Sequence, residues 1–241
     1  MRDKIREILR EGIVESLAPT KICIFDFDGT LIDTAVPETG IPLWKSEFGF
    51  DWPFSGWWGR PESLDSRTYL NGDSEKIKNH LISLVENNLF DKNKIDSTIE
   101  KVINVNIFKN ESISSVVSAH DKEFNKPGVL TFMMTGRVKK LVHYVEDILI
   151  EQNSIKFNAY YYNDKSSTLE FKKGKISEFI QTYPTVKIIE MWDDRVEHLA
   201  EFKKFGDDNY PDLQIILNHV VGKSVVKFWT KDDKKSKKGN Q

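Results

Sequence analysis

The stretch FDFDGTLID, residues 25–33, follows the apolar run Ile22-Cys23-Ile24-Phe25, which is typical of a buried β-strand. Side chains alternate along a strand, so Asp26 and Asp28 are predicted to point to the same place. Two carboxylates at one place repel each other unless a cation lies between them or one of them is protonated. The stretch therefore indicates a chemical site at the end of a buried strand.

Beyond this stretch, the patterns of helices and strands alternate along the chain. Strands are predicted at 129–134, 157–162, 186–192 and 213–217, and helices at about 110–124, 136–149, 176–180 and 196–205. Alternation of this kind predicts an α/β fold, with a Rossmann-like, doubly wound and mostly parallel sheet that carries helices on both faces.

Residues 36–105 interrupt this alternation with an aromatic segment and then helical patterns near 74–89 and 97–103. We assign 20–35 and 106–230 to a catalytic core and 36–105 to an inserted, largely helical cap that covers the site. Residues 1–19 are predicted to form an amphipathic helix. Residues 231–241 contain five lysines and no apolar side chain, which predicts a disordered basic tail.

The composition is that of a soluble globular protein, with 30% charged and 39% hydrophobic residues among 241. The net charge of −2 gives no general attraction to nucleic acid or membrane. Cys23 is the single cysteine, which excludes an intramolecular disulfide and suits a reducing compartment. No apolar run approaches transmembrane length, and the N-terminus lacks the apolar core of a signal peptide. A cytoplasmic location is expected, and no oligomeric state is predicted.

Ligands of open parallel sheets bind beyond the carboxyl ends of the strands, and three predicted strands end there in reactive groups. A site made of carboxylate and hydroxyl oxygens, without cysteine or histidine, is suited to Mg²⁺. The candidate residues are Asp26 and Asp28, Thr135, and Asp193 with Asp194.

A lysine near a helix start adds a positive charge to this set. Lys172, Lys173 and Lys175 all lie in the segment that begins the helix around 176, where acids are normally preferred. A carboxylate nucleophile beside a divalent cation and a lysine suits phosphoryl transfer, because both cations neutralise phosphate oxygens.

Four motifs follow one another in the chain: FDFDGTLIDT, a strand ending in Thr135-Gly136-Arg137, a lysine, and a strand ending in two aspartates. Together and in this order, they resemble the haloacid dehalogenase (HAD) superfamily. The resemblance covers 21–35 and about 110–217 and implies a Mg²⁺-dependent phosphatase.

Each matching residue then has an implied role. Asp26 would be the nucleophile that forms an aspartyl-phosphate, and Asp28 the general acid and base, with its backbone carbonyl on Mg²⁺. Thr135 and Lys172 would hold the phosphoryl group, with Gly136 and Arg137 near the substrate. Asp194 would bind Mg²⁺ directly, and Asp193 directly or through water.

A finer resemblance is to the HAD domain of Swiss Army knife RNA-repair proteins, carried by Gly56-Trp57-Trp58, MMTGR, FKK and MWDDR. It implies that the substrate is an RNA or nucleotide end, whereas the residues themselves are equally compatible with a phosphorylated small molecule. A phosphotransferase shares the covalent step. The alternative from another class is a nucleic-acid-binding or regulatory module with little turnover.

Several features have simpler interpretations. Thr135-Gly136-Arg137 alone would be a helix N-cap, and Asp193-Asp194-Arg195 an ordinary helix start. The aromatic residues of 44–58 are assigned to packing in preference to base stacking. Gly222-Lys223-Ser224 is a turn and not a P-loop. Three of the five histidines, His120, His143 and His198, are assigned structural roles.

Overall fold

The computed structural model describes residues 18–164 and 167–230. Most of the expected N-terminal helix (1–19) and all of the expected tail (231–241) lie outside these residues. Within the described ranges, no helix has the length and apolarity needed to cross a membrane.

The strands are β1 Lys21–Phe25, β2 Ile32–Asp33, β3 Glu111–Ser112, β4 Val129–Val138, β5 Ala159–Asn163, β6 Ile188–Asp193, β7 Gln214–Val221 and β8 Ser224–Thr230. The α-helices are α2 Pro37–Phe48, α3 Ser74–Glu86, α4 Ile95–Asn104, α5 Ser114–Glu123, α6 Val142–Glu146, α7 Thr168–Thr182 and α8 Val196–Asn209. Short 3₁₀ turns at Pro61–Ser63, Ser66–Gly72, Lys92–Lys94 and Lys139–Leu141, and a π-helical turn at Asp147–Gln152, complete the elements.

The chain folds into two compact units. The first contains the described residues up to Ile32, then Ser112–Gly136, and those from Ile155 onward. The second contains Asp33–Glu111 and Arg137–Ser154. The second unit thus includes the segment 36–105 assigned to an insert, and it takes in Arg137–Ser154 from the part of the sequence assigned to the core.

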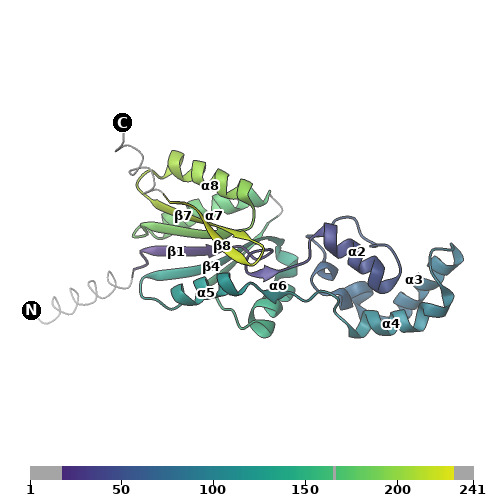
Figure 1. The fold of residues 1–241 in the computed structure, drawn as a ribbon. Helices are drawn as coiled ribbons and strands as arrows, with labels where there is room; N and C mark the ends of the chain where they lie inside the picture. Colours follow the sequence, from purple (N-terminus) through teal and green to yellow (C-terminus); the bar gives the residue numbers. More distant parts are fainter. Residues whose placement is uncertain (1–17, 165–166, 231–241) are drawn as a thin grey trace, which may run out of the picture. The chain divides into compact units, whose positions relative to one another are not determined.

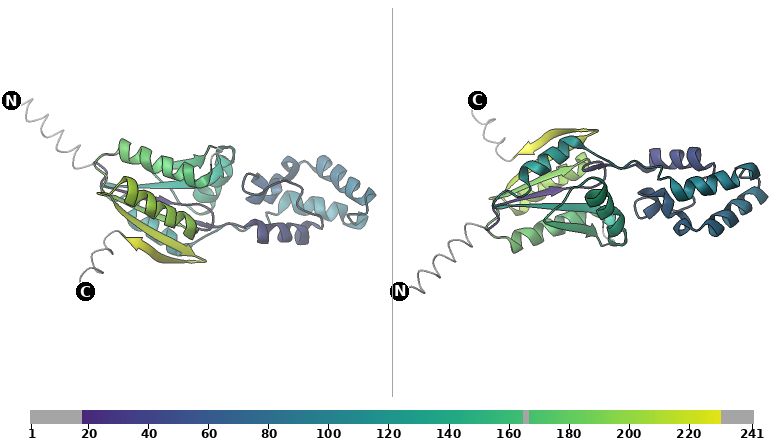
Figure 2. Two further views of the ribbon diagram at one scale, coloured as in Figure 1. Left: turned by 90° about the horizontal axis from the view of Figure 1, so that it is seen from above. Right: turned by 90° about the horizontal axis from the view of Figure 1, so that it is seen from below.

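The first unit is built on a six-stranded sheet in the order β5-β4-β1-β6-β7-β8 (Figure 1). β1 pairs in parallel with both β4 and β6, β6 pairs in parallel with β7, and β8 returns antiparallel to β7. Helices α7 and α8 lie over one face of the sheet and α5 over the other (Figure 2). The predicted α/β class with a mostly parallel, doubly wound sheet is confirmed.

β1 is apolar from Ile22 to Phe25 because it is a central strand and is covered on both faces. Ile22 and Ile24 belong to the core cluster that includes Phe179 of α7 and Phe202 of α8. Phe25 points to the other face, where its ring stacks on that of Trp192 with the centroids 4.2 Å apart. The side chain that follows Phe25 returns to the α7 face, and that side chain is Asp26.

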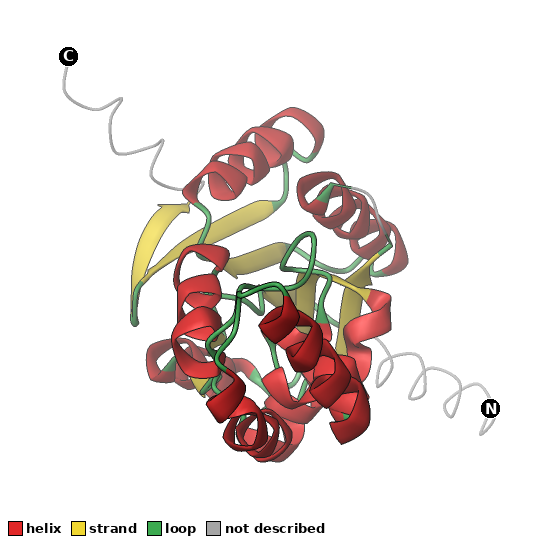
Figure 3. Cartoon of the chain, turned by 90° about the vertical axis from the view of Figure 1, so that its right-hand side faces the viewer, coloured by secondary structure: helices red, strands yellow, loops and turns green. Residues whose placement is uncertain are grey.

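The second unit is built mainly from helices and loops (Figure 3), and its core contains much of the aromatic segment. Trp44, Phe48, Phe50 and Trp57 are at most 3% exposed. The Trp44 ring makes edge contacts with several other rings, the nearest being that of Phe48, with the centroids 4.6 Å apart. The packing interpretation therefore holds for these four residues, whereas Trp52, Phe54 and Trp58 are only half-buried.

Two local predictions meet different outcomes. β4 continues to Val138, so Thr135-Gly136-Arg137 lies inside a strand, and the prediction that Gly136 opens a helix is wrong. The following helix starts only after the 3₁₀ turn at Lys139–Leu141. The turn at Gly222-Lys223 is confirmed: Val221 pairs with Ser224 across it, and Gly222 has a φ of +58°.

Candidate active site

The acidic residues meet between β1 and β6, where the order of the strands in the sheet reverses. From β1 the chain continues in this sheet to β4 on one side, whereas from β6 it continues to β7 on the other. Connections that leave neighbouring strands in opposite directions open a crevice at their carboxyl ends. Asp26 follows β1 and its backbone N–H donates to the Trp192 carbonyl of β6 (3.0 Å), which fixes the two strand ends together.

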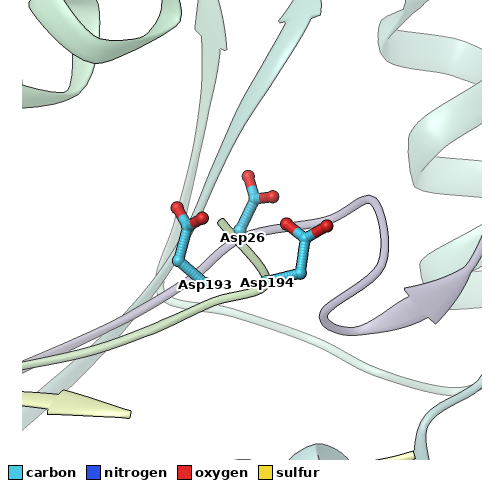
Figure 4. A group of neighbouring side chains, drawn as sticks. All are labelled: Asp26, Asp193 and Asp194. Carbon is cyan, nitrogen blue, oxygen red and sulfur yellow. The ribbon is translucent and has the colours of Figure 1, made fainter. Parts of the chain in front are cut away.

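Three carboxylates converge at this crevice. Oxygens of Asp26, Asp193 and Asp194 lie within 4.8 Å of one another, and Figure 4 shows the three side chains pointing to the same side of the strand ends. Asp26 and Asp193 are buried and Asp194 is half-buried. Oδ1 of Asp194 is shielded from solvent and has no hydrogen-bond partner among the described residues. An all-oxygen set with one unused buried oxygen fits a hard divalent cation such as Mg²⁺.

Lys172 is the lysine that the structure brings to these acids. Helix α7 begins after Ser167, whose hydroxyl accepts from the Glu170 N–H, and places Lys172 on its buried face. The side chain is 2% exposed, and its Nζ donates to Asp26 Oδ1 and to Asp193 Oδ2, both at 2.7 Å.

The other two candidate lysines are engaged elsewhere. Lys173 pairs with Glu201 at 3.0 Å, and Lys175 pairs with Glu178 at 2.6 Å, both near the protein surface. Lys172 alone among the three contacts the acidic cluster.

Burial and mutual repulsion divide the three acids into two kinds. Loss of solvent, together with the neighbouring acids, raises the pKa of Asp26 to about 8 even though Lys172 acts in the opposite direction. Loss of solvent and the charge of Asp193 raise the pKa of Asp194 to about 6. Asp193 is also desolvated, but Lys172, the Arg195 N–H and His198 hold its pKa below its ordinary value. One ammonium group thus cannot neutralise the negative charge of three carboxylates. A divalent cation would offset the charge that remains.

The DFDGT turn lies against the same cluster. Gly29 has a φ of +66°, and a Cβ at this position would lie 2.6 Å from Oδ2 of Asp194, so glycine is required both by the backbone and by the space. Asp28 is half-buried next to it and pairs with Ile32 in an isolated bridge. The hydroxyl of Thr30 is fully buried and has no partner among the described residues.

The TGR residues are placed differently from one another. Thr135 is fully buried in β4, next to the central strand. Gly136 makes room for α7, because a Cβ there would lie 2.7 Å from Oγ1 of Thr168. Arg137 belongs to the second unit, where its guanidinium donates to Ser63 Oγ (2.7 Å) and to the Trp58 carbonyl (3.2 Å).

Two histidines near the aspartate pair were not selected as site residues from the sequence. His198, in the first turn of α8, has its Nδ1 3.8 Å from Asp193 Oδ1. The spacing MWDDRVEH, in which His198 follows Arg195 by three positions, is a signal that points to it. His219 of β7 has its Nε2 2.9 Å from the carbonyl oxygen of Asp194, and no local pattern in the sequence marks it.

Comparison with known proteins identifies relatives of the chain. The profile of HAD domain family 1 in Swiss Army Knife RNA repair proteins matches residues 53–227, a range that includes Lys172, Asp193 and Asp194 but begins after Asp26. A curated relative, the uncharacterized protein YMR265C of Saccharomyces cerevisiae, is 21% identical over 203 residues. The match covers 78% of this chain and only 37% of that relative, so the chain spans little more than a third of its length.

Proposed function

Because the chain belongs to HAD domain family 1 of Swiss Army Knife RNA repair proteins, we propose that it is a Mg²⁺-dependent phosphohydrolase that works through Asp26. The observation that carries the proposal is the contact of one buried lysine with Asp26 and Asp193 beside the unused oxygen of Asp194. A binding protein has no need of three converging carboxylates, two of them buried, whose desolvation is costly.

In the first step, a carboxylate oxygen of Asp26 attacks the phosphorus of a phosphate monoester, and the bond from phosphorus to the leaving oxygen breaks. Asp28 gives a proton to that oxygen. In the second step, water attacks the phosphorus of the aspartyl-phosphate, Asp28 takes a proton from the water, and the bond to Asp26 breaks to release orthophosphate. Lys172 and Thr135 hold the phosphoryl group in both steps.

The cation would be held by Asp26, Asp193 and Asp194, together with the backbone carbonyl of Asp28. When bound, Mg²⁺ supplies positive charge that offsets the charge of the phosphoryl oxygens. The same charge favours the ionised form of Asp26, which is the form needed for attack. Lys172 acts on Asp26 in the same direction and also neutralises phosphate oxygens.

The substrate class is proposed from the family, whose description names RNA repair proteins. It is a phosphate monoester at the end of an RNA or on a nucleotide, with a phosphorylated metabolite as the second candidate. Transfer to an alcohol acceptor instead of water would make the protein a phosphotransferase.

The test is phosphate release by the wild type, Asp26→Asn and Asp212→Asn, each with and without Mg²⁺. Asp212 is an exposed loop residue, so its substitution is a matched control for loss of a carboxylate. The panel contains an aryl phosphate, mononucleotides, and RNA and DNA with 5′- or 3′-terminal phosphate. We expect release by the wild type and the control, dependent on Mg²⁺, and none by Asp26→Asn.

The covalent step is tested separately. Reduction of the trapped acyl phosphate with borohydride converts Asp26 to homoserine, which mass spectrometry detects in a peptide containing residue 26. Adding an alcohol acceptor distinguishes hydrolysis from transfer by the product formed. If no compound releases phosphate and oligonucleotide binding is unchanged in Asp26→Asn, the nucleic-acid-binding alternative replaces the proposal.

A further inference from the structure

We infer that His219, a residue of β7 outside the four motifs, positions Asp194 for cation binding by holding its backbone. The inference rests on the proposed function in so far as Asp194 is a metal ligand. His219 and Asp194 both belong to the first unit. The inference concerns orientation of a ligand and does not make His219 a catalytic residue.

The first step is that, within the described part of the chain, one oxygen of the Asp194 carboxylate has no hydrogen-bond partner. Asp193 is fixed by Lys172 at 2.7 Å and by the Arg195 N–H at 2.9 Å, and Asp26 is fixed by Lys172 at 2.7 Å. Oδ1 of Asp194, by contrast, has no partner among the described residues. Where Oδ1 lies therefore depends in large part on the backbone of Asp194.

The second step is that the backbone pairing of β6 with β7 ends one residue before Asp194. β6 ends at Asp193, which is the last residue of β6 in register with β7 and pairs with His219. Asp194 is the first residue beyond the ladder. Here the side chain of His219 supplies the hydrogen bond, with its Nε2 2.9 Å from the Asp194 carbonyl oxygen.

The geometry also fixes the tautomer. A carbonyl oxygen can only accept, so Nε2 of His219 must carry the hydrogen. The ring is itself supported by β8, since its edge meets the ring of Phe228 with the centroids 6.4 Å apart and the planes at 81°. The β7–β8 hairpin thus supports the ring, and the ring holds the Asp194 carbonyl. Oδ2 of the Asp194 carboxylate lies close to Gly29 of the DFDGT turn.

Residues that orient a metal ligand in this way commonly change metal affinity by about 10–100-fold when they are removed. Glutamine carries its Nε2 the same number of bonds from Cα as histidine does, whereas asparagine carries its amide nitrogen at the position of Nδ1. His219→Gln and His219→Asn are therefore matched in polarity and differ in whether a donor reaches the Asp194 carbonyl. His219→Leu removes the donor altogether.

The experiment is a titration of the purified full chain with Mn²⁺, followed by the electron paramagnetic resonance signal of the free ion, with Mg²⁺ as competitor. Melting temperatures without metal monitor folding. We expect the Mn²⁺ dissociation constant of His219→Asn and His219→Leu to rise about 10-fold or more, and that of His219→Gln to stay within about threefold of the wild type.

Three results would overturn the inference. Equal affinity in the wild type and all three variants would mean that His219 does not position the ligand. Equal loss in all three, including glutamine, would mean that the imidazole ring acts by packing. Absence of Mn²⁺ and Mg²⁺ binding by the wild type would remove the metal centre, and this outcome alone would also refute the metal dependence of the proposed function.

Discussion

Replacing Lys172 by methionine is the most informative perturbation of this protein. The ammonium group is 2% exposed and donates to two buried carboxylates, Asp26 and Asp193, at 2.7 Å each. Methionine keeps the length of the side chain and most of its helix propensity, so the change removes chiefly the charge.

The size of the effect follows from these distances. At an effective dielectric constant of about 20, each contact at 2.7 Å corresponds to about 6 kcal/mol of Coulomb attraction, before the cost of desolvating the lysine is subtracted. Removal of one partner from a buried ion pair typically costs about 3–5 kcal/mol, because the remaining charge is left uncompensated. We expect a loss in this range for the metal-free first unit.

The loss should depend on pH. Burial already raises the pKa of Asp26 to about 8, and removal of Lys172 raises it further. An acid whose folded-state pKa lies above its unfolded value favours folding at low pH, and this contribution is lost as the pH rises through the folded-state value. The cost of Lys172→Met is therefore smaller at pH 6, where Asp26 is protonated in both proteins, and grows as the pH rises above about 8.

The assay must report on the first unit alone. Cys23 lies in β1, is fully buried and is the single cysteine, so pulsed alkylation of its thiol across a urea series measures unfolding of this unit. With an m-value of about 2–3 kcal/mol/M, the expected loss moves the midpoint by about 1–2.5 M.

Lys175→Met is the matched control. Lys175 lies on the same helix and also pairs with a carboxylate, that of Glu178 at 2.6 Å, but both side chains are partly exposed. Such surface pairs contribute about 0.2–1 kcal/mol. Equal midpoints for the two variants, or a cost of Lys172→Met that does not grow between pH 6 and 8.5, would refute the reasoning.

Three further predictions concern the same unit. Without metal, its melting temperature should fall as the pH rises from about 5 to 8.5. Burial raises the pKa of Asp194 to about 6 and that of Asp26 to about 8, so folding is favoured where these groups are protonated. Mg²⁺ should remove most of this pH dependence. Gly29→Ala should lower both stability and Mn²⁺ affinity, whereas Gly174→Ala, in an open position of α7, should stabilise by about 0.5–1 kcal/mol in the same urea assay. Cys23, whose pKa burial raises to about 12, should react with a disulfide reagent only in denaturant; labelling at the rate of a free thiol without urea would contradict its placement.

The acids of the site were predictable from the sequence because their position depends on few facts. Whatever the order of the strands, parallel strands present their carboxyl ends at one edge of a sheet. Asp26 and the pair Asp193-Asp194 each follow an apolar strand, so their proximity required only that β1 and β6 lie close together. The order β4-β1-β6 makes the two strands direct neighbours.

The choice among three lysines was also within reach of the sequence. Lys172, Ile176 and Phe179 are spaced by four and then three residues, which places them on one face of a helix, and all three are buried. Lys173 and Lys175 lie off this face. The apolar periodicity of α7 therefore identifies the lysine that points inward, independently of any family resemblance.

The end of β4 was not predictable in the same way. Arg137 is 1% exposed, and in most sequences a charged residue after Thr-Gly indicates a turn or a helix start. Its burial depends on Ser63 and Trp58, which are more than seventy positions away in the chain. No local pattern carries that information, and the strand accordingly runs four residues further than predicted.

The same reasoning separates the two histidines near the aspartate pair. His198 follows the aspartate pair within one helical turn, so a search around the motif finds it. His219 reaches Asp194 only because the register of β6 and β7 sets Asp193 opposite it. A shift of this register by one residue would turn the side chain of residue 219 to the other face of the sheet and leave the Asp194 carbonyl without its donor. Sequence motifs identify the groups that carry out chemistry at strand ends, whereas the residues that hold those groups in place are selected by strand register, and register becomes visible only in the folded chain.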